Sequence, residues 1–461
     1  MNVGTDIDLH SSPVNGAAKA GRGALGAGNV PGSEAISRMT FGQAARSMWL
    51  DGVSTGFFSL NAYVALVAMG GDAAGYGEEL STLVTMLPSV AMLFATLYNA
   101  GGTARKRRRY FLFAGGFGKG IYVLIPLLVL LPGIAPPFAF VSLVGLSAIA
   151  FAGVPPALNQ IWGANYSAAS RGKMFALLSM FSMFAVMVSS FVAGRFLDSA
   201  PMFDGVANYQ LLYPFGAIIG AGAMLGYYRI RLRYAAAVQA GERRGAGAVA
   251  RFGRSIMRAV HLLKEDRNFR TYEIGFFLYG LAFMMLLPVI PVLFKNFLNA
   301  DYQDFAGATV VTTQLMLMLM APVVAWLARG RRVTQVTGVA FSVLLLYPLV
   351  LTLTAATKSL YLAYASFVVF GVAMSGVHFV WNLGPVTFAR GGNALPHTST
   401  HATLVGARAL IGFPLSYALM KAFPGQLVPV FAVAAALLVL GVITMWRLDR
   451  RMKSQGLSQT T

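Results

Sequence analysis

Apolar stretches of about twenty residues alternate with short polar segments along most of the chain. A helix needs about 20 apolar residues to cross the hydrocarbon of a bilayer, so each stretch predicts one membrane span. The predicted fold is an all-α polytopic membrane protein with 12 transmembrane helices in two pseudo-symmetric six-helix bundles. The spans are predicted at 45–70, 79–100, 110–132, 137–160, 173–195, 210–230, 270–294, 306–328, 333–356, 360–388, 400–422 and 425–447.

A basic segment, Arg229–Arg270, separates the two sets of six spans and holds eleven Lys/Arg and three Asp/Glu. Within it, apolar residues recur at spacings of four, four and three, at Phe252, Ile256, Val260 and Leu263. This spacing predicts a basic amphipathic helix on the anionic inner leaflet of a membrane. The predicted divisions are a cytoplasmic tail at 1–44, a bundle at 45–230, a linker at 231–269, a bundle at 270–448 and a second cytoplasmic tail at 449–461.

The composition supports the prediction of a helical membrane protein. Hydrophobic residues make up 57% of the chain and charged residues 11%, whereas soluble domains are about a quarter charged. Continuous apolar stretches exclude an outer-membrane β-barrel, whose strands alternate apolar and polar residues. The absence of cysteine excludes disulfides and thiolate metal sites. Residues 1–40 are rich in Gly, Ala and Ser without a signal-peptide core, so we expect them to be disordered.

Positive charge predicts the orientation, because cytoplasmic loops are enriched in Lys and Arg. If both termini are cytoplasmic, the tails and inner loops carry 30 Lys/Arg and the outer loops carry four. The net charge of +20 is therefore assigned to lipid headgroups and not to nucleic acid. We expect a monomer in the inner membrane of a bacterium.

The two halves share features at equivalent positions. Basic loops follow the second and eighth spans, at Arg105–Arg109 and Arg329–Arg332, and an Arg-Gly turn at Ser170–Phe175 precedes the fifth. With twelve spans and a long basic central loop, the sequence resembles the major facilitator superfamily of secondary transporters. The resemblance implies that spans 1, 4, 7 and 10 line a central cavity, that spans 2, 5, 8 and 11 join the halves, and that the others face lipid.

Two acidic residues lie inside predicted spans, where ionisable groups are costly and usually functional. Desolvation disfavours the ionised form of Asp51 in the first span, which makes it a candidate for proton coupling. The alternative is a pair between Asp51 and Arg46 or a loop cation. Glu273 lies close to Arg270, which favours a charge pair at the start of the seventh span.

Two cations also lie within spans. Arg408 is expected either to anchor a substrate anion or to pair with an acid such as Glu273. Lys119 lies in the third span among the glycines of 115–120. It could extend toward the membrane surface or take a partner from a closely packed helix, and the sequence leaves both open.

Polar and aromatic residues supply further candidates for binding a small organic solute. His378, Trp381 and Asn382 lie near one face of the tenth span, where a cavity or interhelical hydrogen bonding would explain them. The remaining candidates are Asn159, Gln160 and Trp162 in the fourth span, Asn61 in the first, Tyr279 in the seventh and Gln314 in the eighth.

Enzyme signatures are missing from the sequence, which contains no phosphate-binding Walker loop. His397 and His401 lie four residues apart without an obvious third ligand, so no metal site is predicted. No cofactor is predicted either. The function predicted from the sequence is secondary active transport of a small organic solute, driven by protons through Asp51. The alternatives are an importer or exchanger of organic anions without protons, and a membrane receptor or assembly factor that does not transport.

Overall fold

The computed structural model describes residues 33–69, 75–99, 104–166, 168–230, 248–389 and 395–456. The N-terminal half consists of α2 (Ser33–Phe58), α3 (Asn61–Val67), α4 (Gly77–Asn99), α5 (Ala104–Phe113), η1 (Ala114–Lys119), η2 (Gly120–Leu130), α6 (Ala135–Phe151), α7 (Val154–Asn165), α8 (Ala168–Asp198) and α9 (Asn208–Arg229). Helix α11 (Ala248–Glu265) follows. Residues 1–32 of the predicted tail, 231–247 of the linker and 457–461 lie outside the described residues.

The C-terminal half consists of α12 (Arg267–Leu286), α13 (Val289–Val292), η3 (Leu293–Phe297), α14 (Tyr302–Ala306), η4 (Gly307–Thr312), α15 (Thr313–Ala328), α16 (Val333–Leu344), α17 (Leu346–Thr357), α18 (Leu360–Thr387), α19 (Leu395–Ala422) and α20 (Val428–Ser454). Asp266 begins α12, because its carboxylate accepts hydrogen bonds from the backbone N–H groups of Asn268 and Phe269.

Helices occupy all twelve positions at which the hydropathy pattern predicts spans. Within the described residues, ten helices are long and apolar enough to cross a membrane, and α6 is a shorter apolar helix. The prediction of an all-helical membrane fold is therefore confirmed. The count of twelve complete spans rests on α4 and α6 as well as on these ten.

Several spans are not continuous α-helices. The first breaks between α2 and α3, where the Ser59 hydroxyl donates to the Gly56 carbonyl at 2.7 Å. The fourth breaks between α6 and α7, because Pro155 lacks an N–H group and fits only the first turn of a helix. The third changes from α-helix to the π-helical η1, which ends at Lys119. π-Helical turns often occur at functional positions.

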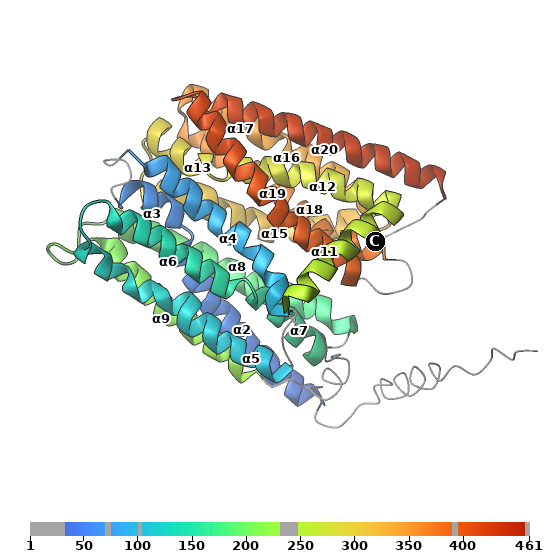
Figure 1. Cartoon of the computed structure of the whole chain (residues 1–461), viewed down its shortest axis with the longest axis horizontal. Coiled ribbons are helices and arrows are strands. Elements are labelled where there is room, and N and C mark those ends of the chain that lie inside the picture. The colour runs from blue at the N-terminus through green and yellow to red at the C-terminus, as the bar shows by residue number, and fades with distance from the viewer. Residues whose placement is uncertain are drawn as a thin grey trace, which may run out of the picture.

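The two halves meet through two sets of helices. Helix α4 packs against α19, and α8 packs against α14, η4 and α15. These are spans 2, 11, 5 and 8, the interface that the family resemblance implied. Figure 1 shows the N-terminal half, blue to green, beside the C-terminal half, yellow to red.

The bundle has two distinct ends (Figure 1). We name them the α3 end, which carries α3 and α13, and the α11 end, crossed by α11. Helix α11 packs against α19, α12 and α4, so it contacts both halves. Its Leu262 and Leu263 are half-buried against the core and Val260 is exposed. The side chains of Phe252 and Ile256, two members of the predicted apolar face, lie outside the described part.

Candidate functional site

An aspartate and a lysine meet inside the N-terminal half. Asp51 lies on α2, and its Oδ1 atom is 3.2 Å from Nζ of Lys119, the last residue of η1. The same ammonium group donates to Thr55 Oγ1 at 3.3 Å. The exposed fractions are 7% for the Lys119 side chain and 15% for Asp51. The partner of Asp51 is therefore a cation from another span and not Arg46.

The helices around Lys119 are packed closely enough to bury its long stem. Gly118 of η1 lies against α6, and a side chain at Gly220 of α9 would come within 3.0 Å of the Lys119 stem. The ammonium nitrogen lies 4.6 Å from the centre of the Phe151 ring and 5.5 Å from that of Phe58. Lys119 thus points into the bundle, where aromatic faces and one carboxylate surround its charge.

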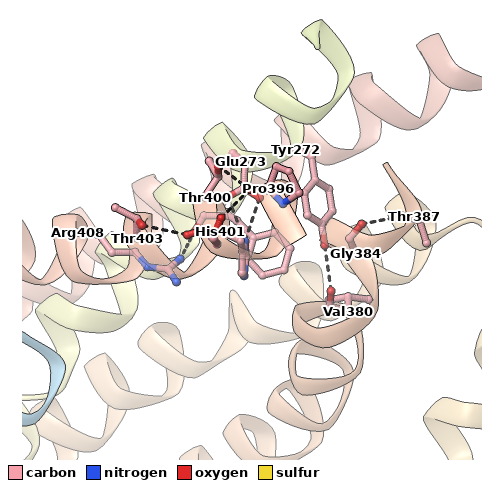
Figure 2. Close-up of polar contacts among 12 residues, drawn as sticks. Tyr272, Glu273, Val380, Gly384, Thr387, Pro396, Thr400, His401, Thr403 and Arg408 are labelled. Atoms are coloured by element: carbon pink, nitrogen blue, oxygen red, sulfur yellow. Dashed lines mark hydrogen bonds and ion pairs between the residues drawn. The ribbon is translucent and has the colours of Figure 1, made fainter. Parts of the chain in front are cut away.

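A glutamate and a histidine meet inside the C-terminal half, as Figure 2 shows. Nδ1 of His401 on α19 lies 3.0 Å from each carboxylate oxygen of Glu273 on α12. The side chains are only 4% (His401) and 3% (Glu273) exposed. The sequence favoured a charge pair near the start of α12 for Glu273. The structure instead places the carboxylate against an imidazole from a distant part of the chain.

Arg408 lies two turns further along α19 from His401. Its Nη1 donates to the backbone carbonyl of Phe276 at 2.7 Å, and its residue is 2% exposed. The guanidinium carbon lies 5.2 Å from the centre of the Trp381 ring and 6.0 Å from that of Tyr279. Among the described residues, Arg408 forms no ion pair, because the nearby carboxylate of Glu273 is bound to His401.

Aromatic rings hold this cluster together. Trp381 and His401 pack edge to face with centres 4.5 Å apart, and Phe276 packs on His401 in the same way at 5.0 Å. Tyr279 packs edge to face on Phe276 at 5.8 Å. We call Glu273, Phe276, Tyr279, Trp381, His401 and Arg408 the C-half cluster. It joins three spans, because its members come from α12, α18 and α19.

The other predicted residues do not form one site. Asn61 Oδ1 accepts from Tyr213 Oη at 2.7 Å and its Nδ2 donates to Tyr122 Oη at 3.4 Å, which ties three helices together. Trp162 is buried against Tyr166 in a separate apolar cluster. The Oε1 atom of Gln314 is buried without a hydrogen bond in the described part of the chain.

His378 and Asn382 lie on the exposed face of α18, where Asn382 Nδ2 donates to the His378 carbonyl at 2.9 Å. Trp381, which lies between them in the sequence, is half-buried and belongs to the C-half cluster through its contact with Arg408. The side chains of Asn159 and Gln160 lie outside the described residues. The structure therefore brings Trp381, Tyr279, Glu273 and Arg408 together, and leaves Trp162 of α7 in a separate cluster.

Sequence reasoning missed His401, which it considered only as a possible metal ligand with His397. His401 binds Glu273, and His397 packs against Phe269 with ring centres 4.7 Å apart. Across the described ranges, no group of three His, Cys, Asp or Glu could hold a metal ion. One signal was available. His401 and Arg408 are seven residues apart, which places both on one face of a helix.

Polar contacts join the halves at the α3 end. Glu79 of α4 pairs with Lys421 of α19 at 2.7 Å and accepts from Tyr417 Oη at 3.1 Å. The carboxylate of Asp198 on α8 accepts from the backbone N–H groups of Tyr302 and Gln303 at 3.0 and 2.7 Å. Two acids thus hold both interhelical interfaces closed at this end.

Comparison with known proteins agrees with this architecture. The family model described as Major Facilitator Superfamily matches residues 52–393. Among curated proteins, the comparison finds no match to this sequence.

Solved structures of transporters share the fold. The nucleoside transporter NupG matches with a TM-score of 0.60 at 11% identity, over 89% of this chain and 98% of that chain. A POT family transporter in complex with 5-aminolevulinic acid matches with a TM-score of 0.67 at 11% identity, over 88% and 94%. A D-xylose-proton symporter matches with a TM-score of 0.61 at 13% identity, over 90% and 96%. At these identities the likeness concerns the fold alone.

Proposed function

Because the chain belongs to the major facilitator superfamily, we propose that it is a proton-coupled secondary active transporter of a small organic solute. In such transporters two bundles rock about a site near the middle of the membrane, so that the site opens to each side in turn. The structurally similar proteins are a nucleoside transporter, a POT family transporter and a D-xylose-proton symporter. The family points to a transporter and not to an enzyme.

The contact between Glu273 and His401 carries the proposal of proton coupling. A carboxylate and an imidazole are both groups that accept and release protons, so their contact offers a place at which a transported proton could be held. Both side chains are almost fully buried, so a change of charge there alters the energy of the surrounding helices strongly. His401 contacts the carboxylate of Glu273 directly. Arg408, His397 and Tyr272 lie close enough to interact with that carboxylate electrostatically.

Asp51 is the second candidate for the proton site, as the sequence predicts. Its Oδ1 atom is held in an ion pair with Nζ of Lys119 at 3.2 Å. Protonation of Asp51 would neutralise its carboxylate and remove the attraction that holds this pair together. We therefore assign the proton first to Glu273 and His401, and propose that the Asp51–Lys119 pair holds α2 against η1.

Uptake into proteoliposomes tests the coupling. Solutes that raise the melting temperature of the purified protein are selected first, because a ligand that binds the folded state stabilises it. We expect an imposed pH gradient to drive accumulation of such a solute, and Glu273→Gln to retain binding but lose the response to the gradient. Equal uptake with and without the gradient would refute proton coupling. Gradient-driven uptake that survives Glu273→Gln and is lost in Asp51→Asn would move the proton site to Asp51.

An exchanger of organic anions without proton coupling is the second candidate function. Arg408 favours it, since its buried guanidinium has no carboxylate partner among the described residues. The two candidates differ in one readout. An exchanger moves labelled anion only when unlabelled anion is present on the opposite side, and it does so at any pH gradient.

We also propose a location and a membrane contact. The excess of Lys and Arg assigns the α11 end and both termini to the cytoplasmic side of a bacterial inner membrane. The basic sequence of α11 then suits a position at the anionic headgroups of the inner leaflet, while Leu262 and Leu263 pack on the bundle. The proposed functional unit is a monomer.

A further inference from the structure

We propose that Arg408 and Trp381 form a subsite for the oxyanion group of an aromatic carboxylate or sulfonate. This inference rests on the proposed transport function and names its substrate class. Three features of the C-half cluster support it: the free edge of the guanidinium, the space made for it, and the aromatic rings beside it.

The guanidinium of Arg408 is only partly used by the protein. Nη1 donates to the Phe276 carbonyl at 2.7 Å. Nε is buried without a hydrogen-bond partner, and within the described residues Nη2 makes no hydrogen bond. The Nε–Nη2 edge is one that can bind a carboxylate or sulfonate through two parallel hydrogen bonds. A guanidinium that only tied α19 to α12 would need Nη1 alone.

The bundle is shaped around this side chain. A methyl group at Gly280 of α12 would overlap the Nη1, Nε and Cδ atoms of Arg408. Glycine therefore admits the guanidinium between α12 and α19. The positive charge is also uncompensated by contact, because His401 occupies the carboxylate of Glu273. A charge inside a membrane protein normally has a partner of opposite sign, and here a bound anion would provide it.

Aromatic rings next to Arg408 define the rest of the ligand. Trp381 lies 5.2 Å from the guanidinium carbon and is half-buried, so part of its ring remains accessible. On the same helix, His378 and Asn382 are exposed. Two polar side chains on a membrane span avoid lipid, which indicates that this face of α18 points to the space between the halves. A flat aromatic body can pack on Trp381 while its oxyanion reaches Arg408.

Binding of matched probes to the purified full-length protein tests the proposal. Benzoate and benzenesulfonate carry the anion, and benzamide and benzenesulfonamide are their neutral counterparts. We expect both anions to raise the melting temperature in a concentration-dependent manner and to bind at least about tenfold more tightly than the amides, since charge-assisted hydrogen bonds are the stronger ones. Arg408→Gln should abolish this preference, and Arg267→Gln, an exposed arginine at the start of α12, should retain it.

A second variant covers the case in which Arg408→Gln does not fold. Gly280→Ala displaces the guanidinium without removing its charge, and should weaken anion binding about tenfold while leaving the amides unaffected. The proposal is overturned if neither anion binds more tightly than its amide, or if folded Arg408→Gln or Gly280→Ala keeps the anion preference.

The transport function can fail separately from the subsite. Benzenesulfonate is permanently charged and crosses a bilayer poorly on its own, so its uptake into proteoliposomes reports on the protein. Binding that depends on Arg408, combined with uptake that ignores a pH gradient, would retain the subsite and refute proton coupling. Gradient-driven uptake of a solute, combined with benzoate and benzenesulfonate binding no tighter than that of their amides, would retain proton coupling and refute the subsite.

Discussion

The two buried acids of this protein differ in the residue that each one contacts. Asp51 contacts an ammonium group and Glu273 contacts an imidazole. The first contact is an ion pair between opposite charges, whereas histidine is the residue type that proteins use most often to take up and release protons. The Asp51–Lys119 contact is therefore suited to a persistent ion pair, and the Glu273–His401 contact to a proton that comes and goes.

Removing one member of the ion pair should destabilise the protein. Lys119→Met leaves the carboxylate of Asp51 without its cation in a largely buried position. We expect a loss of about 3 kcal/mol, the lower end of the range for broken buried pairs, because Asp51 keeps some exposure. Thermal unfolding in detergent measures it. The double variant Asp51→Asn/Lys119→Met should recover most of the loss, and an unchanged melting temperature in the single variant would contradict the buried pair.

Asn61 should act on stability and not on solute binding. Asn61→Leu removes hydrogen bonds to Tyr213 and Tyr122, and leaves two buried hydroxyl groups with fewer partners. We expect a loss of about 1–3 kcal/mol in unfolding free energy, with solute affinity within about twofold of the parent protein. Denaturation and binding titrations on the same preparation separate the two effects. A large loss of affinity in a stable variant would return Asn61 to the binding site.

At the level of helices, the closure of the α3 end depends on close backbone approach. Gly194 of α8 packs against α14, where a Cβ atom would lie 2.9 Å from Gln303 Cα and from the Tyr302 carbonyl oxygen. Asp198, one turn along α8, accepts hydrogen bonds from the same two residues. The glycine and the carboxylate thus support one contact between the halves.

A bulky residue at Gly194 should hold the α3 end open. Gly194→Leu prevents α8 from reaching α14, because the obstructing atoms are backbone and cannot turn aside. We expect a cysteine placed at Tyr63, which is buried here against Phe305, to react at least about tenfold faster with a water-soluble maleimide in this variant. Gly222→Leu, at a glycine of α9 in open space, is the matched control. Equal rates in both variants would contradict closure by this contact.

Helix α11 should influence the membrane surface more than the binding site. Deleting residues 251–264 removes its basic residues and the contacts of Leu262 and Leu263. We expect the protein in nanodiscs to cosediment less with vesicles that contain anionic lipid. We expect its solute affinity, measured by titration, to be unchanged. Loss of solute binding on deletion would show that α11 supports the site through its contacts with α19 and α4.

For the molecule as a whole, hydropathy predicts the order and the approximate limits of the helices, because burial in lipid dictates composition directly. It does not predict the break at Ser59 or the π-helical η1, which depend on local hydrogen bonds and on neighbouring helices. The sequence also does not predict which residues pair with the two buried acids. Lys119 and Asp51 are far apart in the sequence, as are His401 and Glu273, so only tertiary packing decides which pairs form.

The central claim is that the two halves alternate between states and that protonation of Glu273 shifts the balance. Glu273 and His401 hold α12 to α19, and α19 also packs against α4 across the interface. Loss of that attraction should therefore change how α19 packs against α4, and with it the balance between the closed and the open α3 end. The chain has no cysteine, so spin labels can be introduced without removing native residues.

The most direct measurement is the distance between spin labels at Met202 and Tyr361, by double electron–electron resonance in nanodiscs. Both residues are exposed at the α3 end, one in each half; labels at Met202 and Tyr76, both in the N-terminal half, are the control. We predict two distances for the first pair. The longer one gains population when the pH is lowered and dominates in Glu273→Gln, while the control pair stays constant. A single distance, unchanged by pH and by Glu273→Gln, would contradict the account.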